Sequence, residues 1–256
     1  MRAVTVPAIA LDDVHKRYGA RQVLRGITLA IAAGQSVALV GLNGAGKTTL
    51  LRCLLDFQRA DRGQLRIDGV AAAQAQARSR LTFLPERFQA PPFLTGREFL
   101  RLSADLHAQD WHADQAEAQC LALALAPGDL DKPVARLSKG SSQKLGLAAC
   151  LLSRKALYIL DEPLSGLDVQ ARALAIGQLN GLRAAGCTLF FTCHEPADID
   201  VLCDRMVLLH DGQLHFDGST MALKARFSSS SLEQSVLECL AAPPGVPADP
   251  VSGLSP

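Results

Sequence analysis

The feature that most constrains this chain is a glycine-rich stretch, Gly41-Leu42-Asn43-Gly44-Ala45-Gly46-Lys47-Thr48-Thr49, which fits the pattern G-x-x-x-x-G-K-[ST]. The apolar run 37–40 before it is typical of a buried strand, and residues 50–57 after it have the pattern of a helix. Glycines at a strand-to-helix turn let successive N–H groups point into one concavity, and the helix N-terminus adds partial positive charge. The stretch is therefore predicted to be a phosphate-binding loop, or P-loop.

Two side chains in this loop have predicted roles. Lys47 is expected to hold the β and γ phosphates of a nucleotide as a point charge, and the Thr48 hydroxyl is expected to ligate the Mg²⁺ that accompanies ATP or GTP. The alternative is a glycine-rich turn with a lysine on a helix face, which the flanking strand and helix patterns disfavour.

Composition places the chain among globular proteins. It has 256 residues, of which 48% are hydrophobic and 20% charged. A net charge of +1 gives no reason to expect nucleic acid as the main partner, although a local basic patch stays open. The seven cysteines form no C-x-x-C pair and are expected to be buried free thiols in a reducing cytosol. No apolar run approaches the roughly 18 residues of a spanning helix, so the chain is not expected to be membrane-integral.

Strand patterns recur along the chain and separate into two kinds. Residues 9–31 alternate apolar positions with turns, and 64–69 form another short strand pattern. Buried-type strands are predicted at residues 81–84, 157–160, 188–192 and 206–209, with a hairpin turn at Asp211-Gly212. Because strands and helices alternate in the second half, the sequence predicts an α/β fold with a parallel sheet covered on both faces.

Helices are predicted between these strands. Residues 86–153 have helical character and look like an insertion, with one helix at 114–126 stopped by Pro127-Gly128, and a later helix is predicted at 169–185 with Asp168 as N-cap. Residues 71–77 fit a helix or a loop equally well. We expect one domain over residues 1–227, followed by a linker, a short helical segment and a disordered tail in 228–256, where the last sixteen residues hold five prolines.

A second acidic strand end follows the P-loop at a distance. In Tyr158-Ile159-Leu160-Asp161-Glu162-Pro163, apolar residues run directly into two carboxylates. Asp161 is expected to hold Mg²⁺ through water, and Glu162 to polarise the water that attacks the γ phosphate. The alternative is a strand that ends in a solvated acidic turn.

A third motif gives the chain a family resemblance. Leu137-Ser138-Lys139-Gly140-Ser141-Ser142-Gln143 is similar to the LSGGQ signature, with changes at Lys139 and Ser141. Together with the P-loop and the acidic strand end, it makes residues 8–220 resemble an ATP-binding cassette (ABC) transporter ATPase subunit. The resemblance implies a P-loop NTPase fold: a RecA-like parallel sheet core, an N-terminal antiparallel β subdomain and an inserted α-helical subdomain. It also implies that the signature (Leu137, Ser138, Lys139, Gly140, Ser141) faces the ATP of a second subunit.

Further residues match family positions. Ser165-Gly166-Leu167-Asp168 resembles the D-loop, which in the family touches the opposing site; Asp168 can also be an ordinary N-cap. His194 matches the switch histidine that contacts the γ phosphate, and Tyr18 matches the aromatic residue that stacks on adenine. The alternatives are a structural histidine and a tyrosine that packs beside a turn.

Glu86 departs from the family pattern, because most members have glutamine at this position, called the Q-loop. Such Leu-Pro-Glu sequences resemble an exporter branch. A carboxylate near the γ phosphate is unfavourable unless a metal or cation compensates its charge. The expected role is therefore coupling to the helical segment and to a membrane partner more than catalysis.

The resemblance implies an ATPase that uses ATP and Mg²⁺ and closes as a head-to-tail dimer around two nucleotides, with a second copy or with another ABC ATPase subunit. The expected partners are separate transmembrane permease subunits, contacted around residues 86–101, so the expected location is cytoplasmic and peripheral at the inner face of the cell membrane. The pattern SKGxxQ and the segment 231–236 favour export. Two rivals stay open: a non-transport ABC ATPase acting on ribosomes or DNA, and a regulatory nucleotide-binding module with little turnover. The transported substrate is not indicated.

Overall fold

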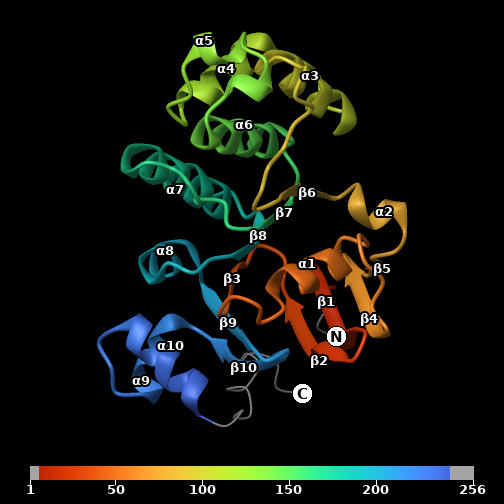
Figure 1. Cartoon of the computed structure of the whole chain (residues 1–256), viewed down its shortest axis with the longest axis vertical. Helices are drawn as coiled ribbons and strands as arrows, with labels where there is room; N and C mark the ends of the chain where they lie inside the picture. Colours follow the sequence, from red (N-terminus) through yellow and green to blue (C-terminus); the bar gives the residue numbers. More distant parts are fainter. Residues whose placement is uncertain (1–5, 243–256) are drawn as a thin grey trace, which may run out of the picture. The chain divides into compact units, whose positions relative to one another are not determined.

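The computed structural model describes residues 6–242, and the chain divides into two compact units (Figure 1). Unit 1 consists of the chain up to Arg78 together with the chain from Thr188 onward, and unit 2 is Ser79–Cys187. The predicted tail falls largely on residues 243–256, which lie outside the described residues. Within residues 6–242, no helix is long and apolar enough to cross a membrane.

Unit 1 contains an antiparallel sheet near the start of the chain. Strands β1 (Ile9–Tyr18), β2 (Arg21–Ile31), β4 (Arg62–Ile67) and β5 (Val70–Ala71) pair in the order β2-β1-β4-β5. On β2 the apolar side chains Leu24, Ile27, Leu29 and Ile31 are buried, while most of the residues between them are exposed or half-buried. This alternation is that of a sheet with one covered face, so the predicted antiparallel subdomain is confirmed.

The second sheet of unit 1 is mainly parallel. Strand β3 (Ser36–Val40) lies between β8 (Thr188–Thr192) and β9 (Arg205–His210), parallel to both, and β10 (Gln213–Gly218) pairs antiparallel with β9. Every residue of β3 and β8 is buried, as expected for strands covered on both faces. Asp211 and Gly212 join β9 to β10 with φ angles of 44° and 75°, the left-handed pair of a type I′ hairpin turn.

Helices and ion pairs tie unit 1 together. Helix α1 (Lys47–Leu54) contacts β2 and β4, α8 (Pro196–Leu202) packs on β3, and α9 (Thr220–Arg226) and α10 (Leu232–Ala241) pack on β10 (Figure 1). The Arg205 guanidinium forms a two-bond ion pair with Asp217 on the neighbouring strand and also donates to the Ala30 carbonyl at 2.8 Å. One side chain therefore fastens the two sheets of unit 1 to each other.

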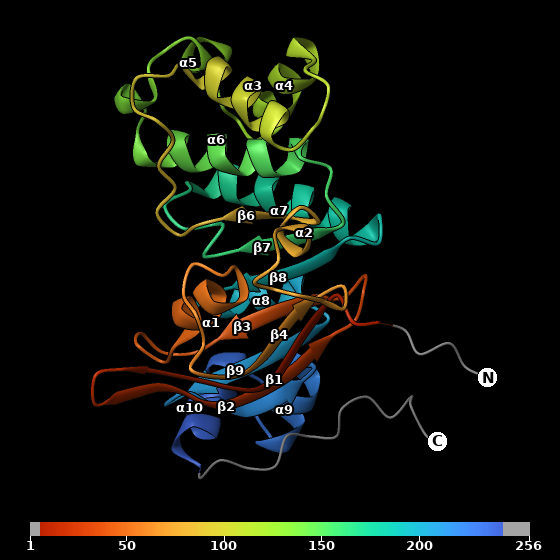
Figure 2. The same ribbon diagram turned by 90° about the vertical axis from the view of Figure 1, so that its right-hand side faces the viewer.

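Unit 2 consists of two parallel strands and a helical segment. β6 (Leu81–Leu84) pairs with β7 (Leu157–Leu160), and between them in the sequence lie α3 (Gly96–Leu106), α4 (Ala113–Leu121), α5 (Pro127–Leu130), a 3₁₀ turn at Val134–Arg136 and α6 (Lys139–Leu152). Helix α6 packs against α3, α4 and β6, so it forms the centre of this unit (Figure 2). Helix α7 (Val169–Ala184) follows β7.

Several predicted helix boundaries were wrong, and after two of the helices a residue with a positive φ turns the chain. The helix predicted at 114–126 ends at Leu121, because the chain turns through Ala124 with φ 53°, and Pro127 begins α5 instead of stopping a helix. Proline suits a first helical turn, where its missing N–H has no intrahelical partner. Similarly, α1 spans 47–54 instead of 50–57, and Asp56 turns the chain with φ 59°. The undecided run 71–77 ends β5 and enters the short helix α2 (Ala75–Arg78).

The cysteines are free, as predicted, with five buried and Cys187 and Cys203 half-buried. The histidine His215 on β10 is also buried, at 5% exposure. Its ring lies 5.1 Å from that of His210, edge to face, and its Nδ1 atom has no hydrogen-bonding partner among the described residues. Burial, followed by the nearby charge of His210, lowers the pKa of His215 below its ordinary value.

This lowered pKa predicts a pH-dependent stability. Because the unfolded chain protonates His215 near pH 6.5 and the folded chain resists protonation, His215 should make the free energy of unfolding decrease as the pH falls below about 6.5. In His215→Phe, the loss of stability between pH 7.5 and pH 5.5 should be smaller than in the wild type. At pH 8 the variant should be at least as stable, because it removes an unsatisfied buried nitrogen. Urea unfolding followed by circular dichroism measures both, and an unchanged pH slope would contradict the prediction.

Candidate functional site

The P-loop connects the buried strand β3 to helix α1. Gly41 has no room for a side chain, because a Cβ atom there would lie 2.3 Å from the Leu209 carbonyl oxygen of β9. Gly46 is the N-cap of α1 with φ 112°, and no side chain caps this helix. The first N–H groups of α1 are therefore left for another acceptor. The rim of the loop, from Leu42 to Gly44, is exposed. This is the geometry of an open anion cradle at a helix N-terminus.

Lys47 lies folded over the same loop. Its Nζ atom donates to the Gly41 carbonyl at 2.7 Å and to the Leu42 carbonyl at 3.4 Å. These carbonyls hold the ammonium group above the loop that is predicted to hold the phosphates. Thr48 is exposed on the first turn of α1, so its hydroxyl is accessible.

The register of the parallel strands places His194 beside the P-loop. Leu39 of β3 lies opposite Thr192 of β8. Gly41 lies two residues after Leu39, and His194 lies two residues after Thr192. Both therefore leave the sheet at the same edge. In parallel sheets, ligands bind at this carboxyl edge of the strands. His194 is exposed there, before α8 begins.

Tyr18 ends strand β1 in the same unit. Its side chain is 41% exposed, and its hydroxyl donates to Gln58 Oε1 at 2.7 Å. The hydroxyl is therefore held by the protein, while part of the side chain is left accessible. A half-exposed aromatic ring of this kind is suited to stack on a base.

The acidic strand end lies in unit 2, beside Glu86. Leu84 of β6 lies opposite Leu160 of β7, and the Asp161 N–H continues the ladder by donating to the Leu84 carbonyl at 2.8 Å. Asp161 is 5% exposed, and Glu162 after it is half-buried. Glu86, two residues beyond β6, leaves its strand at the same edge and is exposed.

Glu162 has an unusual backbone. Its φ of 52° is left-handed, a conformation that costs a residue with a Cβ atom roughly 1–2 kcal/mol. Its carbonyl accepts the N–H of Ser165 at 3.0 Å and the side-chain amide of Gln143 at 3.5 Å, and that amide also donates to the Pro163 carbonyl at 3.3 Å. Strain held by such contacts is common at functional sites. Gln143 was not among the predicted site residues, although it is the last residue of the quoted signature motif, and that motif was the signal that could have found it.

The signature motif begins helix α6. Ser138 is the N-cap, and its Oγ atom accepts the N–H of Ser141 at 3.0 Å. The helix begins at Lys139, directly after this cap, because the cap fixes the first turn. Leu137 is half-buried, whereas Ser138 and Lys139 are exposed.

The D-loop packs directly against the signature. A Cβ atom on Gly140 would lie 3.1 Å from the Gly166 carbonyl oxygen, and one on Gly166 would lie 3.4 Å from Lys139 Cε. After Ser165-Gly166-Leu167, Asp168 caps helix α7 by accepting the Ala171 N–H at 2.8 Å, as predicted. This hydrogen bond, with help from Lys144 at 3.6 Å, lowers the pKa of Asp168. The two motifs therefore form one surface of unit 2.

The predicted site residues thus fall into two groups. Unit 1 carries Tyr18, the P-loop and His194, and unit 2 carries Glu86, Asp161, Glu162, the signature and the D-loop. In unit 1 Thr48 offers a hydroxyl, and in unit 2 Asp161 offers a carboxylate; each is an oxygen donor of the kind that a small hard cation prefers.

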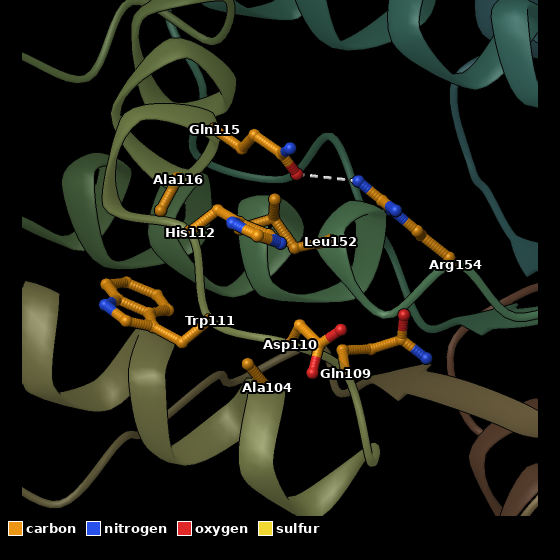
Figure 3. A pocket seen from close by; sticks show the side chains of 9 residues that line it. All are labelled: Ala104, Gln109, Asp110, Trp111, His112, Gln115, Ala116, Leu152 and Arg154. Atoms are coloured by element: carbon orange, nitrogen blue, oxygen red, sulfur yellow. Dashed lines mark hydrogen bonds between the residues drawn. The ribbon is translucent and has the colours of Figure 1, made fainter.

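A pocket in unit 2 lies apart from all of these motifs. It has a volume of about 90 Å³ and lies among α3, the loop before α4 and the end of α6, with Trp111, His112 and Gln115 in its wall (Figure 3). Arg154 donates to Gln115 Oε1 at 2.7 Å across it. No motif residue lines this pocket, so it is not the nucleotide site.

Comparison with known proteins agrees with this geometry. The sequence profile of the ABC transporter family matches residues 24–165. Nod factor export ATP-binding protein I of Burkholderia orbicola (strain AU 1054) is 34% identical over 223 residues, 86% of this chain and 73% of that protein. An aliphatic sulfonates import ATP-binding protein of Pseudomonas aeruginosa (strain UCBPP-PA14) is 34% identical over 247 residues, 94% of this chain and 88% of that protein.

The fold has a close match among solved structures. A structure of the ATP binding subunit of an ABC transporter superposes with a TM-score of 0.82 and 29% identity, and covers 91% of this chain and 99% of that chain. The predicted α/β P-loop fold and the family resemblance are confirmed. The chain therefore belongs to the ABC transporter family and is an ATP-binding subunit with ATPase activity.

Proposed function

We propose that this subunit hydrolyses ATP as one half of a dimer and thereby drives export through separate transmembrane subunits. The observation that carries the proposal is the open P-loop cradle at the carboxyl edge of β3, where the Gly41 carbonyl holds the Lys47 Nζ atom and no side chain caps the first N–H groups of α1. ATP bound there places its γ phosphate toward His194, which leaves the neighbouring strand at the same edge. Tyr18 stacks on the adenine ring.

The residues divide the chemistry among them. Backbone N–H groups of the P-loop and Lys47 stabilise the charge that develops on the transferring phosphoryl group. Thr48 and, through water, Asp161 would hold Mg²⁺, which would neutralise part of the phosphate charge. Glu162 accepts a proton from the attacking water, and His194 orients that water. Glu86 couples ATP hydrolysis to the helical segment and to the membrane partner.

The signature and D-loop support a dimer. In unit 2 they form one surface with exposed residues at Ser138, Lys139 and Gly166. In the proposed head-to-tail dimer, Ser138 and the Gly140 backbone of one copy complete the ATP site of the other. The partner is a second copy or another ABC ATPase subunit.

Export and location rest on sequence features and relatives. Lys139 in the signature and Glu86 at the Q-loop position resemble an exporter branch, and one of the relatives above is named for Nod factor export. The other is named for sulfonate import, so the names of the relatives differ on the direction of transport, and export rests on the two sequence features. We place the subunit in the cytoplasm at the inner membrane face, bound to permease subunits through residues 86–101. We also propose residues 1–227 as its ATPase domain, with the helical subdomain at about 86–153 inserted, and residues 228–256 as the linker, short helical segment and tail that follow it.

The role of Lys47 is tested by Lys47→Ala. Removing the ammonium group should lower the rate of ATP hydrolysis roughly 100-fold or more, because a preorganised charge is lost at the transition state. Phosphate release from the purified protein with MgATP measures this rate. The control is Lys224→Ala, which removes a lysine that pairs with Asp200 at 2.7 Å and should leave the rate unchanged. Tight ATP binding by the wild type without turnover would favour a regulatory module instead.

The dimer is tested by Glu162→Gln. This variant removes the proposed base while it keeps the size of the side chain, so hydrolysis should fall roughly 100-fold or more and ATP binding should persist. Trapped ATP should then hold two copies together, which size-exclusion chromatography with light scattering detects in the presence of MgATP. Glu233→Gln, an exposed carboxylate on α10, is the matched control and should behave as the wild type. A Glu162→Gln protein that stays monomeric with MgATP would contradict the proposed dimer.

A further inference from the structure

Tyr18 is held by a residue that is 40 positions away in the sequence. Its hydroxyl donates to Gln58 Oε1 at 2.7 Å. Gln58 is half-buried and lies in the segment 56–61 between α1 and β4. Tyr18 is 41% exposed, so its ring could otherwise change rotamer, and this hydrogen bond restrains it in one orientation.

The backbone around Tyr18 is fastened to the same segment. The Lys16 ammonium donates to the Arg59 carbonyl at 2.7 Å and to Asp61 Oδ1 at 2.8 Å. Asp61 Oδ2 accepts the Arg17 N–H at 2.6 Å, and the Asp61 N–H donates to the His15 carbonyl at 2.9 Å. Four hydrogen bonds therefore join the end of β1 to this segment, in addition to the one from Tyr18.

Lys16 also restrains the Tyr18 ring near one face. It is 8% exposed, and its Nζ atom lies 5.8 Å from the centroid of the Tyr18 ring. A cation at this distance is attracted to the face of an aromatic ring. The ring is thus restrained at its hydroxyl by Gln58 and near its face by Lys16.

The segment is itself a continuation of the P-loop helix. The N–H groups of Phe57 and Gln58 both donate to the Arg52 carbonyl in α1, at 2.9 and 3.1 Å, and the Asp56 N–H donates to the Cys53 carbonyl at 3.2 Å. Gln58 is therefore fixed to the helix whose opposite end is the P-loop. One end of α1 begins at the P-loop, and the other end is hydrogen-bonded to the segment that holds Tyr18.

We propose that Gln58 is a positioning residue for the nucleotide base: through the Tyr18 hydroxyl it holds the stacking ring at a fixed place relative to the P-loop. The inference rests on the proposed adenine contact of Tyr18. In this proposal, contacts at the far end of α1 set the distance between the phosphate subsite and the base subsite. A nucleotide then binds to a ring that is already ordered. Without the Gln58 hydrogen bond the nucleotide has to order the ring as it binds, and ordering one such side chain typically weakens affinity several-fold.

The test compares ATP with inorganic tripolyphosphate, which has the phosphates and no base. In Gln58→Ala, the Kd for ATP measured by titration calorimetry with Mg²⁺ should rise roughly two- to tenfold, and the Kd for tripolyphosphate should not change. The matched control is Gln74→Ala, an exposed glutamine in the turn before α2, which should leave both values unchanged. Thermal unfolding of each variant checks that it is folded.

A second variant shows whether Gln58 acts through the tyrosine. Tyr18→Phe keeps the aromatic face and removes the hydroxyl, so it should weaken ATP binding by about the same factor as Gln58→Ala. The double variant should bind ATP no more weakly than either single variant, because both changes remove one hydrogen bond.

Other results would overturn the inference. Unchanged ATP affinity in Gln58→Ala would do so. An equal loss of tripolyphosphate affinity would make Gln58 a support of the P-loop instead, and additive losses in the double variant would exclude the hydroxyl as the link. If the wild-type protein bound tripolyphosphate as tightly as ATP, Tyr18 would make no useful contact with the base, and the proposed role of the P-loop would be unaffected. If it bound neither compound, the proposed function would be overturned as well.

Discussion

The close approach of backbone to backbone at the P-loop is the constraint on which the candidate site depends. Gly41 lies so near the Leu209 carbonyl of β9 that no Cβ atom fits between them, and Gly46 begins α1 in a left-handed conformation. These two positions let the chain leave β3, turn within a few residues and enter the helix with its N–H groups exposed. With β3 fixed between β8 and β9, residues that follow the neighbouring strands reach the same edge.

Parallel pairing repeats this arrangement in each unit. In unit 1 the register of β3 and β8 brings His194 level with the start of the P-loop, and in unit 2 the register of β6 and β7 brings Glu86 to the same edge as Asp161 and Glu162. The P-loop, His194, Asp161 and Glu162 therefore follow the ends of strands whose own residues are buried. A rigid, covered sheet holds these chain ends in place, while the loops beyond it carry the chemistry.

The sequence predicted the strands and the motifs well and the helix ends less well. Buried strands such as β3 and β8 are continuous apolar runs, and the hairpin turn at Asp211-Gly212 has a local chemical signature, so both could be predicted from neighbouring residues. The end of α4 could not, because Ala124 takes a left-handed angle that no alanine propensity indicates. Such an angle persists only where surrounding structure stabilises it.

The sequence by itself determined the family and the kind of site, because the P-loop, the pair Asp161-Glu162 and the signature are local patterns with chemical requirements of their own. Only the tertiary structure decided which side chains orient those motifs. Gln143 supports the backbone of Glu162, the D-loop packs on Gly140, and Gln58 holds Tyr18. Each of these contacts joins segments at least 19 residues apart, as with Gln143 and Glu162. Local periodicity carries no information on such pairs, since they meet only when the sheets and helices pack.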